Sequence, residues 1–430
     1  MFKRVRGTQD ILPPGYGQAG QDSCLWQGVE AIARRTFSLY GYREIRTPVL
    51  ENAALFNRSL GESTEIVQKQ MLEVKHAKDD LVLRPEGTAS VVRAYLENNL
   101  DKNKDTSKLY YLGPMFRAER PQKGRLRQFH HIGIEAIGSL SPYLDIEVIS
   151  LSDSLLKALG VNNYQICLNS LGCPDDKARL ARDLRQRLKA KLPKLCFDCR
   201  GRFNRNIFRI LDCKNPACRE IVNDLKMGQD YLCPECAAHF RQITDGLSAI
   251  NVRYKLSYSL VRGLDYYTRT VFEIKHAQLG AQDALGAGGR YDTLVGQLGG
   301  RECGAIGVAF GVERILLVKG PAAAVKGRGL VYIITLGEKA DKKGIELLHS
   351  LRVNNIPADM DYAGRSLKAK MRQANESGAR FCVIIGEDEL VKGNLSLKDM
   401  DSGEQSNIAD NQLLKHLLSS DPGLLVSNNL

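Results

Sequence analysis

The feature that most constrains the fold is a pair of strand-like runs of equal length that lie close together in the chain. The runs are KLYYLGPMFRAE (108–119) and RQFHHIGIEAIG (127–138), separated by the polar, basic segment around PQKGRL (121–126). This layout is typical of an antiparallel hairpin with a charged tip. The first part of the chain therefore predicts an α+β body rich in antiparallel pairing.

Helical and strand-like patterns surround this hairpin. The run CGAIGVAFGVERILLV (303–318) predicts an apolar strand that enters a helix near Gly311. From about 172 to 245 the composition becomes basic and cysteine-rich, with few strand patterns, which indicates an insertion. The other expected elements are helices over 20–40, 87–98 and 142–160 and strands over 42–51 and 80–86, and strand and turn signals return over 252–276.

The C-terminal part has a different pattern. The small, polar GPAAAVKGRG (320–329) predicts a linker. Beyond it, apolar strands alternate with helices, which predicts a compact α/β domain with a mainly parallel sheet. Since 430 residues are too many for one core, we expect a main domain over 1–322, with the insertion inside it, and a second domain over 329–430.

Charge is unevenly distributed over these parts. The net charge is +12, yet 329–430 holds 12 basic and 14 acidic residues, a balance of −2, so 1–328 carries +14. Residues 177–214 alone hold 13 basic and 3 acidic residues, a balance of +10. Such a patch suits a polyanion such as nucleic acid. A solvated helix face of a basic protein is the alternative.

Membrane insertion and secretion are not expected. The sequence has no uninterrupted apolar run of about 18 residues, and no apolar run follows the basic N-terminus. We therefore expect a cytoplasmic protein without a membrane partner. Eleven cysteines in that compartment do not predict a disulfide framework.

The hairpin tip carries side chains that suit a nucleotide. Arg117 and Arg125 offer forked donors for phosphate, Glu119 can accept from an exocyclic amine, and Phe129 can stack on a base. A charged hairpin at a sheet edge is the structural alternative.

Three segments resemble the motifs of class II aminoacyl-tRNA synthetases. EIRTPVLE (44–51) resembles motif 1, the hairpin resembles motif 2, and GVAFGVERI (307–315) resembles motif 3. The resemblance implies a six-stranded antiparallel core, Mg²⁺-ATP as substrate and, through motif 1, a homodimer. It also implies roles for single residues: Arg117 on the α-phosphate and the amino-acid carboxylate, Glu119 on the adenine amine, Arg125 on the γ-phosphate, Phe129 and Arg314 stacked on adenine, and Gln122 and Lys123 at the acceptor end of the tRNA.

Two further runs resemble the histidine-specific motifs of histidyl-tRNA synthetases, RGLDYYTRTVFEI (262–274) and ALGAGGRYDTLV (284–295). Together with RPEGTAS (84–90) they imply a histidine pocket in which Arg262 and Arg117 are catalytic cations. The implied histidine contacts are Glu86 and Tyr267 with the imidazole, Thr88 and Glu135 with the α-ammonium, and Arg117, His131, Arg262 and Tyr266 around them.

Two positions depart from the family pattern. His131 stands where the family usually has Gln, and Thr293 stands where Gly is common. Because imidazole nitrogens can replace part of an amide's hydrogen bonding, we expect His131 to be compatible with activity. Thr293 is expected to be a tolerated change.

The remaining segments fit the same family. The C-terminal part resembles the anticodon-binding domain of class II synthetases, and its near-neutral charge suits recognition of a few splayed bases. The basic insertion lies where the family carries a domain against the acceptor arm of the tRNA. The family resemblance thus implies a bacterial-type ligase that converts L-histidine and ATP to histidyl-adenylate and transfers the histidyl group to tRNA(His).

Two other functions remain open at this point. One is a synthetase-like, histidine-sensing regulatory subunit of ATP phosphoribosyltransferase, although such proteins typically lose the catalytic Arg and the tail. The other is a zinc-ribbon nucleic-acid binder, for which the cysteines would be the active feature.

Six of the cysteines cluster in the insertion, whereas Cys24, Cys167, Cys173, Cys303 and Cys382 are scattered. The two C-x2-C pairs predict a zinc site with four thiolate ligands, Cys196, Cys199, Cys233 and Cys236. Cys213 and Cys218 would then be spare, or would substitute for one pair. Reduced thiols without metal are the alternative.

Overall fold

The computed structural model describes residues 2–14, 16, 20–62, 64–76, 79–102, 106–320, 329–421 and 424. The chain divides into two compact units, Met1–Pro321 and Ala322–Leu430. Residues 321–328 of the expected linker lie outside the described residues. Among the described helices, none is both long and apolar enough to cross a membrane.

A large sheet organises the first unit. Its strand order is β1-β5-β6-β11-β10-β9-β7-β8, and the six strands from β5 to β7 pair antiparallel with their neighbours. The short β1 and β8 add parallel pairs at the two edges. The predicted six-stranded antiparallel core is therefore confirmed. The strands are β1 (Arg43–Glu44), β5 (Ser107–Phe116), β6 (Gln128–Ile137), β7 (Tyr164–Ser170), β8 (Lys255–Leu256), β9 (Thr268–His276), β10 (Ala284–Arg290) and β11 (Ala305–Gly311).

The predicted hairpin is β5 and β6, which pair from Ser107 opposite Ile137 to Phe116 opposite Gln128. Side chains alternate across β6, as the pleat of a strand requires. Ile132 and Ile134 are buried in the core on one side of the sheet, so His131, Gly133 and Glu135 belong to the other side. The apolar and polar alternation of the sequence thus assigns one face to the core and leaves the other for a site.

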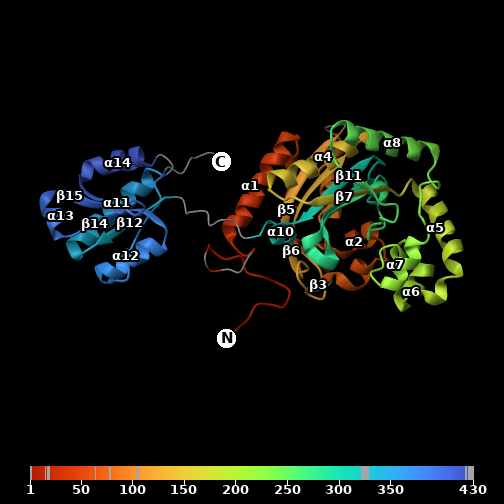
Figure 1. Cartoon of the computed structure of the whole chain (residues 1–430), viewed down its shortest axis with the longest axis horizontal. Helices are drawn as coiled ribbons and strands as arrows, with labels where there is room; N and C mark the ends of the chain where they lie inside the picture. The colour runs from red at the N-terminus through yellow and green to blue at the C-terminus, as the bar shows by residue number, and fades with distance from the viewer. Residues whose placement is uncertain are drawn as a thin grey trace. The chain divides into compact units, whose positions relative to one another are not determined.

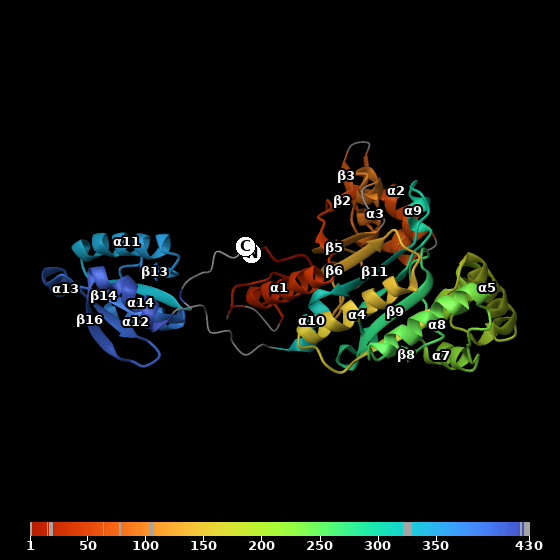
Figure 2. The same cartoon turned by 90° about the horizontal axis from the view of Figure 1, so that it is seen from above.

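Four helices cover the apolar face, and Figure 2 shows α4, α8 and α10 along this side of the sheet. α1 presents Trp26, Val29, Ala33 and Phe37 to it, at the three- and four-residue spacing of an amphipathic helix. A fully buried ion pair joins α4 to β10, with 3.1 Å between Arg290 Nε and Asp145 Oδ2. The helices are α1 (Ser23–Leu39), α4 (Pro142–Ala158), α8 (Pro234–Ala249) and α10 (Val312–Lys319).

Smaller elements lie over the other face, where a second core gathers (Figure 2). The expected strand over 42–51 is wrong as a single element, since β1 and β2 belong to different sheets. Pro48 lies between them and lacks the N–H that a continuous ladder needs. The elements are β2 (Leu50–Asn52), β3 (Leu72–His76), β4 (Asp79–Leu83), α2 (Ala53–Leu60), α3 (Thr88–Glu97) and α9 (Leu294–Gln297).

The insertion is helical, and Figure 1 shows α5, α6 and α7 grouped together. α8 continues past residue 245, and its Phe240, Ile243 and Leu247 pack into the core on the apolar face of the sheet. The helix that leaves the insertion is therefore part of the main body. The other helices are α5 (Pro174–Lys189), α6 (Phe197–Arg205) and α7 (Pro216–Asn223).

The second unit has a sheet of order β13-β12-β14-β15-β16. β12 pairs in parallel with β13 and β14, whereas β14–β15 and β15–β16 are antiparallel. The expectation of a mainly parallel sheet is thus corrected: a hairpin at 394–409 completes it. The elements are β12 (Leu330–Thr335), α11 (Glu338–Val353), β13 (Ala358–Met360), α12 (Leu367–Glu376), β14 (Ala379–Ile385), α13 (Glu387–Lys392), β15 (Asn394–Asp399), β16 (Gln405–Ala409) and α14 (Leu413–Ser420).

Gly307 in β11 gives a test of the packing at the centre of the large sheet. A Cβ at this position would lie 2.7 Å from the Ile134 carbonyl oxygen and 2.7 Å from Glu135 Cδ. We expect Gly307→Ala to lower the free energy of unfolding by about 2–3 kcal/mol, because the Ile134 carbonyl belongs to the paired strand and the Glu135 carboxyl is held by Thr88 and Tyr291. Gly28→Ala, in an exposed position of α1 with open space around it, should raise that energy by about 0.5–1 kcal/mol. Urea unfolding measures both, and equal midpoints for the two variants would contradict the packing argument.

Candidate active site

A pocket of about 650 Å³ opens on the polar side of the large sheet. Strands β6, β9, β10 and β11, the hairpin tip and the insertion all contribute to its wall. The structure brings most of the predicted site residues to this one pocket, namely Glu86, Thr88, Arg117, Glu119, Arg125, Phe129, His131, Arg262, Tyr266, Tyr267 and Arg314.

The start of α3 forms one end of the pocket. Glu86 accepts hydrogen bonds from the backbone N–H groups of Thr88 (2.7 Å) and Ala89 (2.8 Å), so it caps the helix. Burial raises the pKa of the Glu86 carboxyl, although these bonds oppose the shift. The helix start thereby holds a carboxylate at a fixed place in the wall.

Glu135 lies beneath the same end of the pocket and is 1% exposed. Thr88 Oγ1 donates to its Oε1 (2.7 Å), and the Tyr291 hydroxyl donates to its Oε2 (2.6 Å). Burial raises the pKa of Glu135 to about 8, against the stabilising effect of both hydroxyls. A cation that reached this carboxyl would favour its ionised form.

The hairpin tip forms the side of the pocket that carries arginine side chains suited to phosphate groups. The Arg117 guanidinium lies 5.2 Å from the centroid of the Phe129 ring, and its Nε donates to the Pro85 carbonyl oxygen (2.9 Å). Burial lowers the pKa of Arg117 to about 10. Glu119 is buried and ion-paired with Arg125. Gln122 and Lys123 are exposed on the turn beyond these residues, outside the pocket lining.

His131 lies next to Phe129, with 5.0 Å between ring centroids. Burial, together with Arg117 and Arg314, lowers the pKa of its imidazole to about 3. Its buried Nδ1 has no hydrogen-bond partner among the residues that the structure describes. A neutral ring with a free nitrogen in the pocket wall is suited to a hydrogen bond with a ligand.

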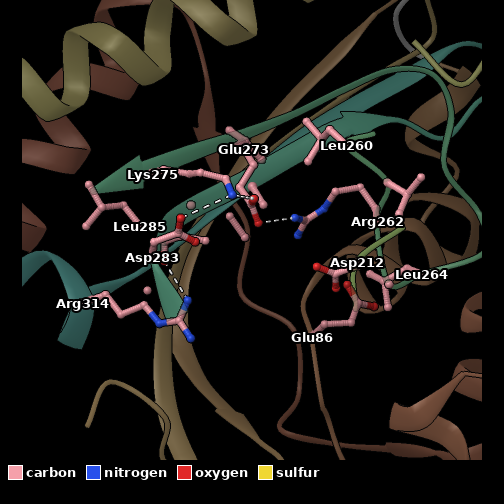
Figure 3. Close-up of a pocket in the computed structure, with 18 of the residues that line it drawn as sticks. Glu86, Asp212, Leu260, Arg262, Leu264, Glu273, Lys275, Asp283, Leu285 and Arg314 are labelled. Carbon is pink, nitrogen blue, oxygen red and sulfur yellow. Dashed lines mark hydrogen bonds and ion pairs between the residues drawn. The ribbon is translucent and has the colours of Figure 1, made fainter. Parts of the chain in front are cut away.

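A row of charged side chains lies between Arg262 and Arg314 in the pocket wall. Arg262 Nη1 donates to Glu273 Oε1 (2.8 Å), and Lys275 Nζ bridges Glu273 (3.2 Å) and Asp283 (3.3 Å). Figure 3 shows this row of alternating charges running from Arg262 toward Arg314. Arg314 is anchored by the carbonyl oxygens of Gly124 (2.9 Å) and Ala284 (2.7 Å).

The rings of Tyr266 and Tyr267 are in tilted contact, with 4.7 Å between their centroids, and both residues are buried. Tyr291 meets the Tyr266 ring edge-on at 5.8 Å. The three rings make an apolar wall near the two buried carboxyls, of the size that a planar heterocycle would contact.

Several lining residues were not predicted from the sequence. Glu273 could have been found from strand alternation, since apolar Phe272 and Ile274 flank it in β9. The sequence did not indicate Tyr111 or Tyr291 as site residues, because single aromatic residues are common in protein cores. Arg209, Asp212, Lys214 and Arg219 come from the insertion and line the same pocket. The sequence could not indicate these residues, because they reach the pocket only through the way the insertion packs over the sheet.

The expected cysteine site is corrected by the structure. Cys196 and Cys199 cluster with Cys213 and Cys218, whereas Cys233 and Cys236 cluster with Cys173 and Asp176. The two C-x2-C pairs start different helices, α6 and α8, which separates them. The alternative in which Cys213 and Cys218 replace one pair fits the geometry.

The pKa of His131 has a consequence for stability. The folded chain keeps this ring neutral, whereas the unfolded chain protonates it below about pH 6.5, so acid favours unfolding through His131. The stabilisation is complete above about pH 6.5 and is lost as the pH falls toward 3. We therefore compare the fall in unfolding free energy when the pH is lowered from about 7 to about 5, measured by urea titration. This fall should be about 2 kcal/mol smaller for His131→Gln than for the original chain. Equal losses would contradict a buried neutral ring.

Comparison with known proteins assigns the family. Residues 23–315 match the family model described as Histidyl-tRNA synthetase, and residues 330–420 match that of an Anticodon binding domain. A histidine–tRNA ligase of Halothermothrix orenii is 44% identical over 96% of this chain and 98% of its own length. A histidine–tRNA ligase of Moorella thermoacetica is 46% identical over 95% of this chain and 96% of its own length. The crystal structure of apo S. aureus histidyl-tRNA synthetase is 34% identical, has a TM-score of 0.79, and the match covers 97% of this chain and 99% of that chain. The chain therefore belongs to the histidyl-tRNA synthetase family of the class II aminoacyl-tRNA synthetases.

Proposed function

We propose that this chain is a histidine–tRNA ligase that activates L-histidine with Mg²⁺-ATP and transfers it to tRNA(His). The observation that carries the proposal is the convergence of Arg117, Arg262 and Arg314 on one pocket that also holds Glu86 and, beneath it, Glu135. Cations suit the phosphates and the reacting carboxylate, and the acidic end suits an ammonium group and an imidazole.

ATP takes the side of the pocket near the hairpin tip. Phe129 and Arg314 enclose the adenine, and Glu119 accepts from its amine. Arg125 is ion-paired with Glu119, and ATP exchanges this contact for Arg125 on the γ-phosphate and the amine on Glu119. Arg117 stays at the α-phosphate, supported by its hydrogen bond to Pro85.

Histidine takes the side near α3 and the tyrosines. Its α-ammonium binds Thr88 and Glu135, and its imidazole binds Glu86 and Tyr267, with Tyr266 lining the ring. His131, whose Nδ1 is unpaired among the described residues, supplies a further hydrogen bond in place of the Gln usual in the family. Arg262, held by Glu273, reaches the carboxylate.

The reaction then proceeds in two steps. A carboxylate oxygen of histidine attacks the α-phosphorus of ATP, an O–P bond forms, and pyrophosphate leaves with the electrons of the broken P–O bond. Arg117 and Arg262 stabilise the negative charge of this transition state. The terminal ribose hydroxyl of the tRNA next attacks the adenylate carbonyl, AMP leaves, and the hydroxyl proton is released. Positioning and electrostatics are the main contributions of the chain.

Transfer RNA contacts three parts of the chain in this proposal. Gln122 and Lys123, exposed on the hairpin turn, reach the acceptor end. The basic helices of the insertion bind backbone phosphates, and the second unit, which matches an anticodon-binding family, reads anticodon bases. We further propose that the enzyme is a cytoplasmic homodimer that pairs through the motif 1 segment.

A histidine-sensing regulatory subunit is less well supported. A regulatory protein needs the histidine pocket but neither the nucleotide arginines nor an anticodon-binding domain. The ligase is favoured because Arg117, Arg262 and Arg314 lie in one pocket and residues 330–420 match an anticodon-binding family.

Pyrophosphate exchange tests the activity. We expect histidine, and no other standard amino acid, to support exchange of labelled pyrophosphate into ATP. Arg262→Ala should reduce this exchange on the order of 10²- to 10³-fold, because a charge-stabilising donor of the transition state is lost. ATP affinity should change by less than about threefold.

Two further variants sharpen this test. Arg262→Lys keeps the charge but not the forked geometry, so its rate should lie between those of Arg262→Ala and the original chain. Arg253→Ala, at an exposed position outside the pocket, is the control and should exchange normally. Absence of exchange with histidine in the folded original chain would refute the ligase proposal, and normal exchange in Arg262→Ala would refute the role of Arg262.

Histidine binding should release a proton from Glu135. Its carboxyl has a pKa of about 8 in the ligand-free chain, so it is mostly protonated at about pH 7, and a bound ammonium favours the ionised form. The affinity for histidine should therefore rise as the pH increases from about 7 to about 8. Calorimetry in buffers of different ionisation enthalpy should detect up to about one proton released per site.

Glu135→Gln is the matched variant, since it keeps the shape of the side chain and cannot ionise. It should bind histidine more weakly and release no proton from this site. The same proton release in Glu135→Gln as in the original chain would assign the proton to another group.

A further inference from the structure

The insertion contains four cysteine side chains that converge on one point. The Sγ atoms of Cys196, Cys199, Cys213 and Cys218 all lie within 4.8 Å of one another. Four thiolates at about 2.3 Å from a tetrahedral zinc ion are separated by about 3.8 Å. Cys196 Sγ and Cys213 Sγ lie 3.9 Å apart. The cluster therefore has the size of a tetrathiolate zinc site.

The local backbone brings these thiols together in two similar pairs. Cys196 is the N-cap of α6 and Cys199 lies in its first turn. Cys218 lies in the first turn of α7, and Cys213 precedes the N-cap of that helix by two residues. The free N–H groups at both helix starts favour negative charge on sulfur. Thiolates, rather than thiols, are the form that binds zinc.

The surroundings also suit bound thiolates. The backbone N–H of Cys196 donates to Cys218 Sγ (3.2 Å), and Arg202 Nη1 lies 4.0 Å from Cys199 Sγ. Four thiolates and one Zn²⁺ carry a net charge of −2, which the +10 balance of residues 177–214 offsets. Hydrogen bonds and countercharges of this kind stabilise the ligands of a metal from outside.

The short helices of the insertion also favour a bound metal ion, because they need additional stabilisation. α6 has 9 residues and α7 has 8, and helices this short are marginal without tertiary support. Cys199 and Cys218 are fully buried between them. A metal ion would cross-link the two helices and the segment before α7 at a single point.

The second cysteine cluster is a weaker candidate. Its acidic member, Asp176, accepts from the backbone N–H groups of Cys233 (3.0 Å) and Cys173 (3.3 Å) and is ion-paired with Arg179. Both of its carboxylate oxygens are therefore used to join the starts of α5 and α8. Three thiols remain there, against four in the first cluster.

We propose that Cys196, Cys199, Cys213 and Cys218 bind one zinc ion, and that this ion fixes the wall that the insertion contributes to the pocket. Asp212 and Lys214 flank Cys213, and Arg219 follows Cys218, and all three line the pocket. Figure 3 shows Asp212 on the same side of the pocket as Arg262. The metal is structural, so its detection does not depend on the proposed ligase activity.

Metal analysis of the full chain tests this site. Protein purified without chelators and with reductant should contain about one zinc per chain by mass spectrometry of the metal. Cys199→Ser and Cys218→Ser should each lose that zinc. Cys236→Ser, in the second cluster, and Cys24→Ser, an exposed cysteine, are matched controls that should keep it. Zinc lost from Cys236→Ser and kept in Cys199→Ser would overturn the assignment, as would a zinc-free chain that takes up none from solution.

Cobalt substitution keeps the proposal testable if the cysteine variants fail to fold. Co²⁺ exchanged into the original chain should give the visible and near-ultraviolet bands of tetrahedral coordination by four thiolates. Bands of an octahedral or nitrogen–oxygen site would overturn the assignment. Zinc removal by a chelator should also make the bonds around 196–219 more sensitive to limited proteolysis, with unchanged cleavage elsewhere. Unchanged cleavage at 196–219 would refute the role of the ion in fixing the wall.

Discussion

The buried carboxyl of Glu135 is the constraint on which the centre of this molecule depends. It lies in the middle of an antiparallel sheet, where an unpaired charge would strongly disfavour folding. Gly307 on the neighbouring strand leaves room for it, and the hydroxyls of Thr88 and Tyr291 satisfy its oxygens. These partners come from α3, β11 and the segment after β10, so the carboxyl fixes the positions of three elements at once.

The opposite side of the pocket concentrates positive charge instead. Burial lowers the pKa of both Arg117 and Arg314, and Arg125, which is close to both, lowers both further. Backbone carbonyl oxygens accept hydrogen bonds from both guanidinium groups, and Glu119 Oε1 lies 4.0 Å from Arg117 Nη1. A site with several guanidinium groups suits a triphosphate. Arg262 differs, since the carboxylate of Glu273 accepts a hydrogen bond from its guanidinium group.

The insertion contributes both a basic surface and part of the pocket wall. Its residues 177–214 carry a balance of +10, and the charged side chains of Arg209, Asp212, Lys214 and Arg219 contribute to the pocket wall. The same short segment carries the cysteine cluster. A surface suited to a polyanion and a wall of the active site therefore belong to one small structure, and whatever stabilises that structure affects both.

The sequence by itself determined the pattern of the large sheet, because alternation in the 127–138 run assigns each side chain to one face, and local pairing fixes the hairpin register. Motifs in contiguous runs of the sequence also predicted eleven of the side chains that line the pocket. Only the tertiary structure decided which cysteines meet, because C-x2-C spacing is local while the fold of α6, α7 and α8 sets the partners. It likewise decided that Glu273 holds Arg262, that Tyr291 supports Glu135, and that the insertion reaches the pocket. Those contacts join residues from different elements, and no periodic pattern in the sequence links such residues. Only the packing of the folded chain brings them together.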